Sequence, residues 1–270
     1  MPEAKELLLK IDDLSIVFGG LRAVSGFSCE LHRGELLGLI GPNGAGKTTV
    51  FNMISGIYMP TEGEISFWDS KERIHRIGKT SPAALNRIGI ARTFQNIRLF
   101  GNLTVEDNVR IALHTRRVAR PLDVLFRLKR YRDDEQAMID KTGELLSLFK
   151  IENKKHELAR NLPYGEQRKL EIARALASEP NLLLLDEPAA GLNREEKDRL
   201  VELIRGVRDD LGITVFLIEH DMDLVMKVSE KVIVVNFGGK IAEGTPNEVQ
   251  SDPLVIEAYL GSEEDDDTFS

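Results

Sequence analysis

The sequence predicts an α/β fold with a mostly parallel sheet, an antiparallel β flank and an inserted helical subdomain. Continuous apolar runs at 35–40, 182–185 and 212–218 are typical of strands buried on both faces, and helical patterns separate them. Residues 7–31 alternate apolar and polar side chains, which indicates two or three antiparallel strands. From about 104 to 162 the periodicity is helical, which interrupts the alternation of strand and helix.

The chain of 270 residues is long for one domain, but it allows one domain with a subdomain. We expect a single domain over residues 1–262. Its core is predicted to comprise about 1–95 and 163–262, and its helical subdomain about 96–162. The acidic residues within 263–270 indicate a solvated, disordered tail.

Composition argues against several classes of protein. The net charge of −8 does not favour nucleic-acid binding. No apolar run approaches the roughly 18 residues of a membrane span, and residues 1–6 lack the layout of a signal peptide. The single cysteine, Cys29, excludes an internal disulfide or a multi-cysteine metal site and is interpreted as a small core residue. Together these features indicate the cytoplasm.

The most informative motif is a glycine-rich loop between the strand at 35–40 and a helical run that begins at Thr49. It matches the phosphate-binding pattern G-x-x-x-x-G-K-[ST] in the strand–loop–helix context that the pattern requires. This context favours a P-loop NTPase core over an ordinary glycine-rich turn. The motif consists of Gly41, Pro42, Asn43, Gly44, Ala45, Gly46, Lys47 and Thr48.

The residue types of this loop suit a phosphate chain. Glycines let successive backbone N–H groups face the phosphates, and the helix N-terminus adds a positive dipole end. Lys47 is expected to reach the β- and γ-phosphates, and the hydroxyl of Thr48 is expected to ligate Mg²⁺. Thr49 is predicted to be a helix residue with a secondary phosphate contact.

Two adjacent acids, Asp186 and Glu187, follow a run of four leucines that predicts a buried parallel strand. In doubly wound sheets, ligands bind at the carboxyl ends of such strands. Adjacent strand residues point to opposite faces, so the two carboxylates are predicted to have different roles. Asp186 suits the Mg²⁺ shell, as a Walker B aspartate, and Glu187 suits polarising the attacking water. The alternative is a chance acidic pair.

Three further residues have weaker signals. Gln95 ends a predicted short strand, where its amide could ligate Mg²⁺ or orient water, although alone it would be an ordinary surface residue. His220 follows a buried strand at the edge where the phosphates are expected. Phe18 precedes a glycine turn and is either a core aromatic, which periodicity favours, or a stacking face for a base.

The order of these motifs resembles that of an ATP-binding-cassette (ABC) ATPase subunit over roughly residues 7–260. The resemblance implies that the glycine loop is Walker A and that Asp186 and Glu187 are the Walker B aspartate and the catalytic acid. It also implies that Phe18 stacks on adenine. ATP and Mg²⁺ are the implied cofactors.

The same resemblance implies four more elements. Gln95 corresponds to the Q-loop residue that couples nucleotide to a transmembrane partner, and His220 to the switch histidine. Gly191 to Asn193 resemble the D-loop. A turn that opens a helix ended by Pro180 resembles the signature motif, which caps ATP bound by the opposite subunit. The signature residues are Leu162, Pro163, Tyr164, Gly165 and Glu166.

Within this superfamily the chain is most similar to ATPases of branched-chain amino-acid importers. The similarity lies in 18–24, 91–96, 186–193 and the closing stretch 244–261. It implies a peripheral position on the inner face of the cell membrane, with integral permease subunits and, indirectly, a periplasmic or extracellular solute-binding protein as partners. ATPases for urea or amide import and for lipopolysaccharide export are similar alternatives.

Two departures from the family pattern concern the partner ATPase. Pro163, Tyr164 and Glu166 replace the serine, first glycine and glutamine of the usual signature. Asn193 stands where most members have aspartate. Because proline cannot donate the serine hydroxyl to a γ-phosphate, we expect a heterodimer with a second ATPase, with a homodimer as the alternative.

Other functions fit less well. A GTPase is disfavoured because the nearest guanine-selecting candidate, 153–156, ends in histidine where aspartate is needed. A soluble ABC ATPase of DNA repair or translation is disfavoured, because such proteins usually have two cassettes or a long coiled-coil insertion and this sequence shows neither. The intact Lys47, Asp186 and Glu187 argue against a non-enzymatic module. The basic stretch 116–132 is interpreted as a solvated helical face, or as a surface facing anionic lipid near a membrane partner.

Overall fold

The structure is a computed structural model that describes residues 6–114 and 129–266. The chain divides into two compact units, one formed by 1–92 with 181–270 and the other by 93–180. The division differs from the expected subdomain boundary, because the second unit extends past 162 to Pro180. Among the described residues, no helix combines the length and the apolar character that a membrane crossing requires.

The first unit contains a six-stranded sheet in the order β10-β9-β3-β8-β7-β6. Its inner strands are parallel, as predicted. All five residues of β3, β7 and β8 are buried, which is typical of a parallel sheet covered on both faces. Only β10 runs antiparallel, as the second strand of a hairpin with β9. The strands are β3 (Leu36–Ile40), β6 (Ile90–Arg92), β7 (Leu182–Asp186), β8 (Thr214–Ile218), β9 (Lys231–Asn236) and β10 (Gly239–Gly244).

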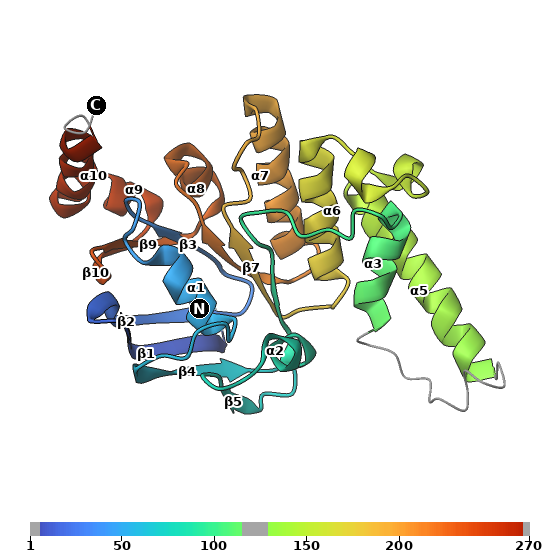
Figure 1. The fold of residues 1–270 in the computed structure, drawn as a ribbon, viewed down its shortest axis with the longest axis horizontal. Coiled ribbons are helices and arrows are strands. Elements are labelled where there is room, and N and C mark those ends of the chain that lie inside the picture. Colours follow the sequence, from blue (N-terminus) through green and yellow to red (C-terminus); the bar gives the residue numbers. More distant parts are fainter. Residues whose placement is uncertain (1–5, 115–128, 267–270) are drawn as a thin grey trace, which may run out of the picture. The chain divides into compact units, whose positions relative to one another are not determined.

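A second sheet in this unit is antiparallel, in the order β2-β1-β4-β5, and confirms the predicted flank. Helix α1 (Lys47–Ile54) lies between the two sheets (Figure 1). Its Phe51 ring packs edge-on against Phe216 of β8, with ring centroids 5.0 Å apart. Cys29 is buried in β2, as expected. The strands are β1 (Leu7–Phe18), β2 (Leu21–His32), β4 (Glu62–Trp68) and β5 (Ile74–Arg76).

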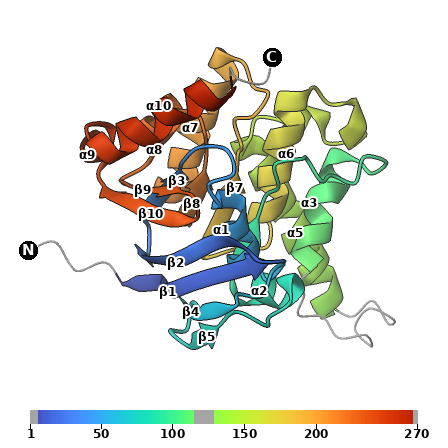
Figure 2. The same ribbon diagram turned by 60° about the vertical axis from the view of Figure 1, so that its left-hand side comes forward.

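Figure 2 shows the other described helices of this unit. Helix α7 buries one stripe that includes Leu200, Ile204 and Val207, and α8 packs against β3. Helix α10 extends into the acidic run that the sequence predicted to be disordered, and 267–270 lie outside the described residues. The helices are α2 (Pro82–Ile88), α7 (Arg194–Asp209), α8 (Met222–Val228), α9 (Pro246–Gln250) and α10 (Pro253–Asp266).

The second unit is helical, in agreement with the predicted periodicity. Helix α3 (Val105–Leu113) packs against both α5 (Lys129–Leu148) and α6 (Tyr164–Leu176). Two 3₁₀ turns, Glu152–Lys154 and Ala159–Asn161, connect α5 to α6. Most of the basic stretch 116–132 lies outside the described residues, so its interpretation stays a prediction.

Candidate functional site

The order of the parallel strands brings three predicted site segments of the first unit to one edge of the sheet. Strand β3, which leads into the glycine loop, pairs with β8, and β8 pairs with β7. Because these strands are parallel, their carboxyl ends lie side by side. Lys47, the pair Asp186 and Glu187, and His220 therefore follow neighbouring strand ends.

The glycine loop needs glycine at two positions for reasons of space and backbone conformation. Gly41 has φ 151°, and a Cβ there would lie 2.0 Å from the carbonyl oxygen of Val235. Gly46 has φ 99°, and its Cβ would lie 2.7 Å from the carbonyl oxygen of Ala23. Any larger residue would push the loop away from the hairpin β9–β10 or from β2.

Lys47 is the first residue of α1, which begins two residues earlier than the helical run predicted. Its Nζ donates to the carbonyl oxygens of Gly41 and Pro42 at 2.7 and 2.9 Å. Burial lowers the pKa of Lys47, and the nearby charges of Glu187 and Asp186 oppose that shift. Next to it, Thr48 is exposed. The loop therefore holds an ammonium group close to the acidic strand end.

Asp186 has a buried cationic partner that the sequence analysis missed. A guanidinium nitrogen of Arg92, at the end of β6, lies 2.6 Å from Asp186 Oδ2. The same guanidinium donates to Asn52 Oδ1 at 2.8 Å and Ser55 Oγ at 2.6 Å, both on or next to α1. Arginine ending a short, buried strand was the available signal, because such a charge must find a partner.

Glu187 lies outside the strand in which the sequence analysis placed it. Strand β7 ends at Asp186, and Glu187 has φ 45°, in the left-handed region. Strand alternation therefore does not apply to the pair. A non-glycine residue in this region costs of order 1–3 kcal/mol, and such residues cluster at functional sites. The N–H of Glu187 donates to Ile218 O at 2.9 Å, which ties the turn to β8.

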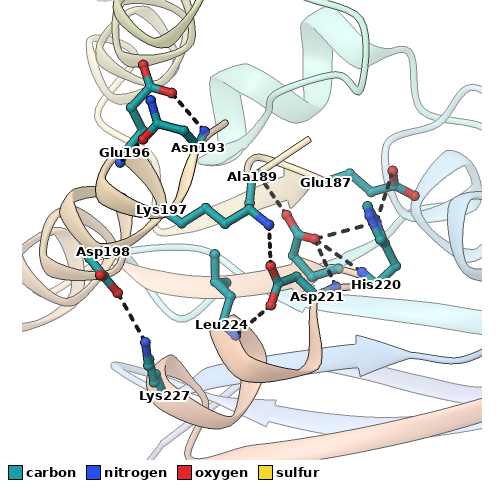
Figure 3. Close-up of polar contacts among 11 residues, drawn as sticks. Glu187, Ala189, Asn193, Glu196, Lys197, Asp198, His220, Asp221, Leu224 and Lys227 are labelled. Atoms are coloured by element: carbon teal, nitrogen blue, oxygen red, sulfur yellow. Dashed lines mark hydrogen bonds and ion pairs between the residues drawn. The ribbon is translucent and has the colours of Figure 1, made fainter. Parts of the chain in front are cut away.

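The structure brings His220 and Glu187 together. The Nδ1 atom of His220 lies 3.5 Å from Glu187 Oε2 (Figure 3). The His220 side chain is 57% exposed and that of Glu187 is 16% exposed, so both are accessible from solvent. A second carboxylate, Glu219 Oε2, lies 3.7 Å from the same nitrogen.

Phe18 ends β1 with 42% of its surface exposed, so the core alternative favoured by periodicity is wrong for this residue. Its ring meets Tyr58 edge-on, with centroids 5.1 Å apart and planes at 70°. An exposed aromatic face held by a second ring is suited to stacking on a base.

In the second unit, Gln95 does not end a strand, because β6 stops at Arg92. The guanidinium of Arg168 holds its backbone instead, donating to the carbonyl oxygens of Phe94 and Gln95 at 2.8 Å each. Arg168 also contacts Glu171 at 2.9 Å, and each of these two side chains is 1% exposed. The sequence analysis did not single out this pair, although an Arg and a Glu three apart on a helix can form one.

The divergent signature opens α6 without a side-chain cap. Pro163 occupies the N-cap position, where it offers no side-chain hydrogen bond. Glu166 accepts from Lys154 Nζ at 2.6 Å, and the Oη of Tyr164 accepts from Arg168 at 3.2 Å. The replaced signature residues thus have partners within the second unit.

Asn193, the other departure, has a defined role in the first unit. Its side chain caps α7 by accepting from the N–H of Glu196 at 3.0 Å, and the Glu196 carboxylate accepts from the N–H of Asn193 at 2.9 Å. Asparagine and aspartate cap helices about equally well, so this capping box keeps its function with either residue.

Comparison with known proteins shows which family has this architecture. A family model described as ABC transporter matches residues 24–190, more than half of the chain. The chain belongs to this ABC transporter family. A second model, described as Branched-chain amino acid ATP-binding cassette transporter, matches residues 240–265.

Relatives of this ABC protein match along almost its whole length. The chain is 44% identical over 254 residues to the high-affinity branched-chain amino acid transport ATP-binding protein LivG of Salmonella typhimurium, covering 94% of this chain and 98% of the relative. It is 41% identical to BraF of Pseudomonas aeruginosa, with the same coverage. A solved ATP-binding cassette of an ABC transporter, in its ADP conformation, matches with a TM-score of 0.80 at 31% identity, covering 94% and 99% of the two chains.

These matches confirm the predicted P-loop NTPase fold and the predicted ABC ATPase family. The protein is a nucleotide-binding ATPase subunit of an ABC transporter. Among the described residues, no group of three or more His, Cys, Asp and Glu side chains is arranged to hold a metal ion.

Proposed function

We propose that this ATPase powers an importer for branched-chain amino acids. The observation that carries the proposal is the similarity to the transport subunits of Salmonella and Pseudomonas, which continues through the C-terminal match at 240–265. The solute sites of such a transporter belong to other chains. The amino-acid specificity is therefore inferred from relatives, whereas the hydrolytic chemistry is argued from this chain's own residues.

The phosphate chain of ATP would lie along the loop from Gly41 to Thr48. The Lys47 ammonium, which now meets two loop carbonyls, is close enough to move onto the β- and γ-phosphates. Phe18 offers its exposed face to the adenine. These contacts bind and orient the nucleotide, which is most of what catalysis of phosphoryl transfer requires.

A Mg²⁺ site is supported by the chemistry of the available donors. Thr48 and Asp186, both in the first unit, offer hydroxyl and carboxylate oxygens, which are the hard ligands that Mg²⁺ prefers. When bound, Mg²⁺ would supply positive charge that offsets the negative charge of the phosphates. Arg92 holds one oxygen of Asp186 at 2.6 Å and so fixes the orientation of that carboxylate.

Glu187 is proposed to accept a proton from the attacking water. His220 is proposed to contact the γ-phosphate. Their separation of 3.5 Å lets the imidazole and the carboxylate orient each other. Attack on the γ-phosphate would then proceed in line, with the leaving group opposite the water.

We further propose that the second unit docks a permease at the inner face of the membrane. Exposed apolar side chains on α3 and α5, including Ile111, Ile139 and Leu148, support a protein contact there.

Co-purification of the permease with this ATPase from membranes tests the docking proposal directly. A Gln136→Cys variant on α5 should cross-link to the permease, whereas Glu257→Cys on α10 is the control; cross-links from Glu257→Cys alone would contradict the docking proposal.

The transport function is tested by reconstituting the purified complex into lipid vesicles with its solute-binding protein. We expect ATP-dependent uptake of labelled leucine, isoleucine or valine, and loss of uptake in a complex that contains Glu187→Gln. Uptake of urea instead, or export of lipopolysaccharide, would contradict the amino-acid assignment while leaving the ATPase assignment intact.

A further inference from the structure

Glu219 is a fully buried carboxylate at the end of β8, directly before His220. Its Oε1 accepts from the N–H of Ala189 at 2.7 Å. Its Oε2 accepts from the N–H groups of His220 and Asp221 at 3.1 and 3.4 Å. These hydrogen bonds join two loops, one following Glu187 and the other containing His220. Figure 3 labels Ala189, His220 and Asp221, the residues that donate them.

The energetics of this arrangement require a reason for the buried charge. Burial raises the pKa of Glu219, and the N–H groups of Ala189, Asp221 and His220 together with the His220 charge oppose the shift. A buried carboxylate is costly unless several donors satisfy it. Backbone N–H groups from two separate loops do so here, so the position of each loop depends on this carboxylate.

Both loops carry residues of the proposed hydrolytic site. Ala189 lies two residues after Glu187, whose N–H donates to Ile218 O in the strand that leads to Glu219. The Nδ1 atom of His220 lies 3.5 Å from Glu187 and 3.7 Å from Glu219. Glu219 therefore contacts the imidazole edge and the backbone of both loops.

We propose that Glu219 is a positioning residue of the ATPase site, which aligns His220 with Glu187 by holding their two loops together. The inference rests on the proposed roles of Glu187 and His220. Glu219 acts through the backbone of His220 and of Ala189.

The proposed role of Glu219 requires two hydrogen-bond-accepting oxygens. Replacement by glutamine, which has the same shape, therefore tests the role directly. Glutamine has one accepting oxygen and an NH₂ group that only donates. In a Glu219→Gln variant that NH₂ must face the N–H of Ala189 or the N–H pair of His220 and Asp221. We expect kcat for ATP to fall on the order of 10- to 100-fold, with KM nearly unchanged.

The control is Asp198→Asn, which also replaces a carboxylate by its amide. Asp198 lies on α7 and pairs with Lys227 of α8 at 3.1 Å, and both side chains are more than half exposed. We expect wild-type kcat and KM from this variant, because exposed ion pairs contribute little. The measurements use the full chain, with steady-state kinetics and equilibrium binding of a fluorescent ATP analogue.

A double-mutant cycle separates positioning from general stabilisation. If Glu219 acts through His220, then Glu219→Gln should cost little further activity in a His220→Ala background. Fully additive losses would overturn the proposal, and so would wild-type kinetics in Glu219→Gln. If His220→Ala and Glu187→Gln themselves turn over ATP normally, the proposed site roles fail instead, which is a distinguishable result.

Hydrogen exchange on the wild-type protein provides a test that needs no substitution and therefore does not depend on whether a variant folds. The N–H groups of Ala189 and His220, which point at Glu219, should exchange slowly although they lie in loops. Exchange of the Ala189 amide as fast as that of an exposed loop amide would overturn the proposal.

Discussion

Single buried charges decide the chemistry at the scale of the residue. Four charged side chains near the sheet edge are less than one-tenth exposed, and each contacts polar atoms: those of Lys47, Arg92, Asp186 and Glu219. A buried charge is tolerated only where partners satisfy it. Lys47 and Glu219 also hold backbone groups near the sheet edge, whereas Arg92 and Asp186 pair through their side chains.

Replacement of Lys47 by alanine should weaken ATP binding on the order of 10- to 100-fold, because a charged hydrogen bond to phosphate is lost. Equilibrium titration with a fluorescent ATP analogue measures this. Lys10→Ala, which removes an exposed lysine paired with Asp12 on β1, is the control and should bind normally. Wild-type affinity in Lys47→Ala would show that the loop does not bind phosphate as proposed.

The two adjacent acids should separate in their effects. Glu187→Gln keeps the shape of the side chain but cannot act as a base, so we expect normal ATP binding and a loss of turnover. Asp186→Asn should raise the Mg²⁺ concentration that half-activates hydrolysis, and it also removes the charge that faces Arg92. Single-turnover assays over a range of Mg²⁺ distinguish them. Equal loss of nucleotide binding in both variants would rule out separate roles.

At the scale of the element, the two departures from the family motifs both lie at the N-terminus of a helix. Asn193 caps α7 within a reciprocal capping box, so its departure from aspartate leaves the helix start intact. Pro163 begins α6 without any side-chain cap, and this departure does remove a hydroxyl. The two departures, which looked equivalent in the sequence, therefore differ in consequence.

Helix α6 also holds the Q-loop backbone through Arg168, which predicts a split between stability and activity. Arg168→Met leaves Glu171 buried without its cation and should destabilise the protein by about 3–5 kcal/mol. Arg168→Met with Glu171→Leu should recover most of that stability, because a buried ion pair can be replaced by apolar residues. ATPase activity should stay low in both, since the carbonyls of Phe94 and Gln95 lose their donor.

Denaturant unfolding and steady-state ATPase assays measure the two effects. The control is Lys141→Met, which breaks an exposed ion pair with Glu144 on α5 and should change stability by less than about 0.5 kcal/mol. Full recovery of activity in the double variant would show that the Arg168 contacts with the Q-loop carbonyls have no functional role.

At the scale of the whole molecule, the replaced signature residue Pro163 bears on which ATPase subunit faces the ATP bound by this chain. We propose a heterodimer with a second, related ATPase, based on Pro163 alone now that Asn193 is explained as a cap. Loss of one hydrogen bond to a charged phosphate costs about 1.5–3 kcal/mol, which corresponds to roughly 10- to 100-fold weaker closure at one site. The partner would supply a stronger signature over the P-loop of this chain.

Stoichiometry of the purified transporter and ATP-dependent dimerisation of isolated Glu187→Gln protein test the heterodimer. We expect one copy of this chain per complex and weak self-association. A variant with Pro163→Ser is the matched comparison and should dimerise more tightly with ATP. A complex with two copies of this chain and no other ATPase would contradict the proposal, as would a tight symmetric homodimer of the Glu187→Gln protein.

The sequence alone determined the features that depend on a contiguous stretch of the chain. The run from β3 through Gly41–Thr48 into α1, the leucine strand before Asp186 and the alternating flank could be predicted because each signal is contiguous. Glycine positions and apolar periodicity reflect constraints on the backbone of the segment itself. The family resemblance has the same origin, because its motifs are short and keep their order.

Only the tertiary structure decided how the buried charges are paired. Arg92 meets Asp186, and the Glu219 carboxylate meets the N–H of Ala189, across 94 and 30 positions of the chain. Arg168 reaches the Gln95 carbonyl across 73 positions. The left-handed turn at Glu187 and the short strand before Gln95 were likewise decided by neighbouring segments. Periodicity shows that a residue is buried, but the partner that satisfies a buried charge depends on which segments the fold brings together.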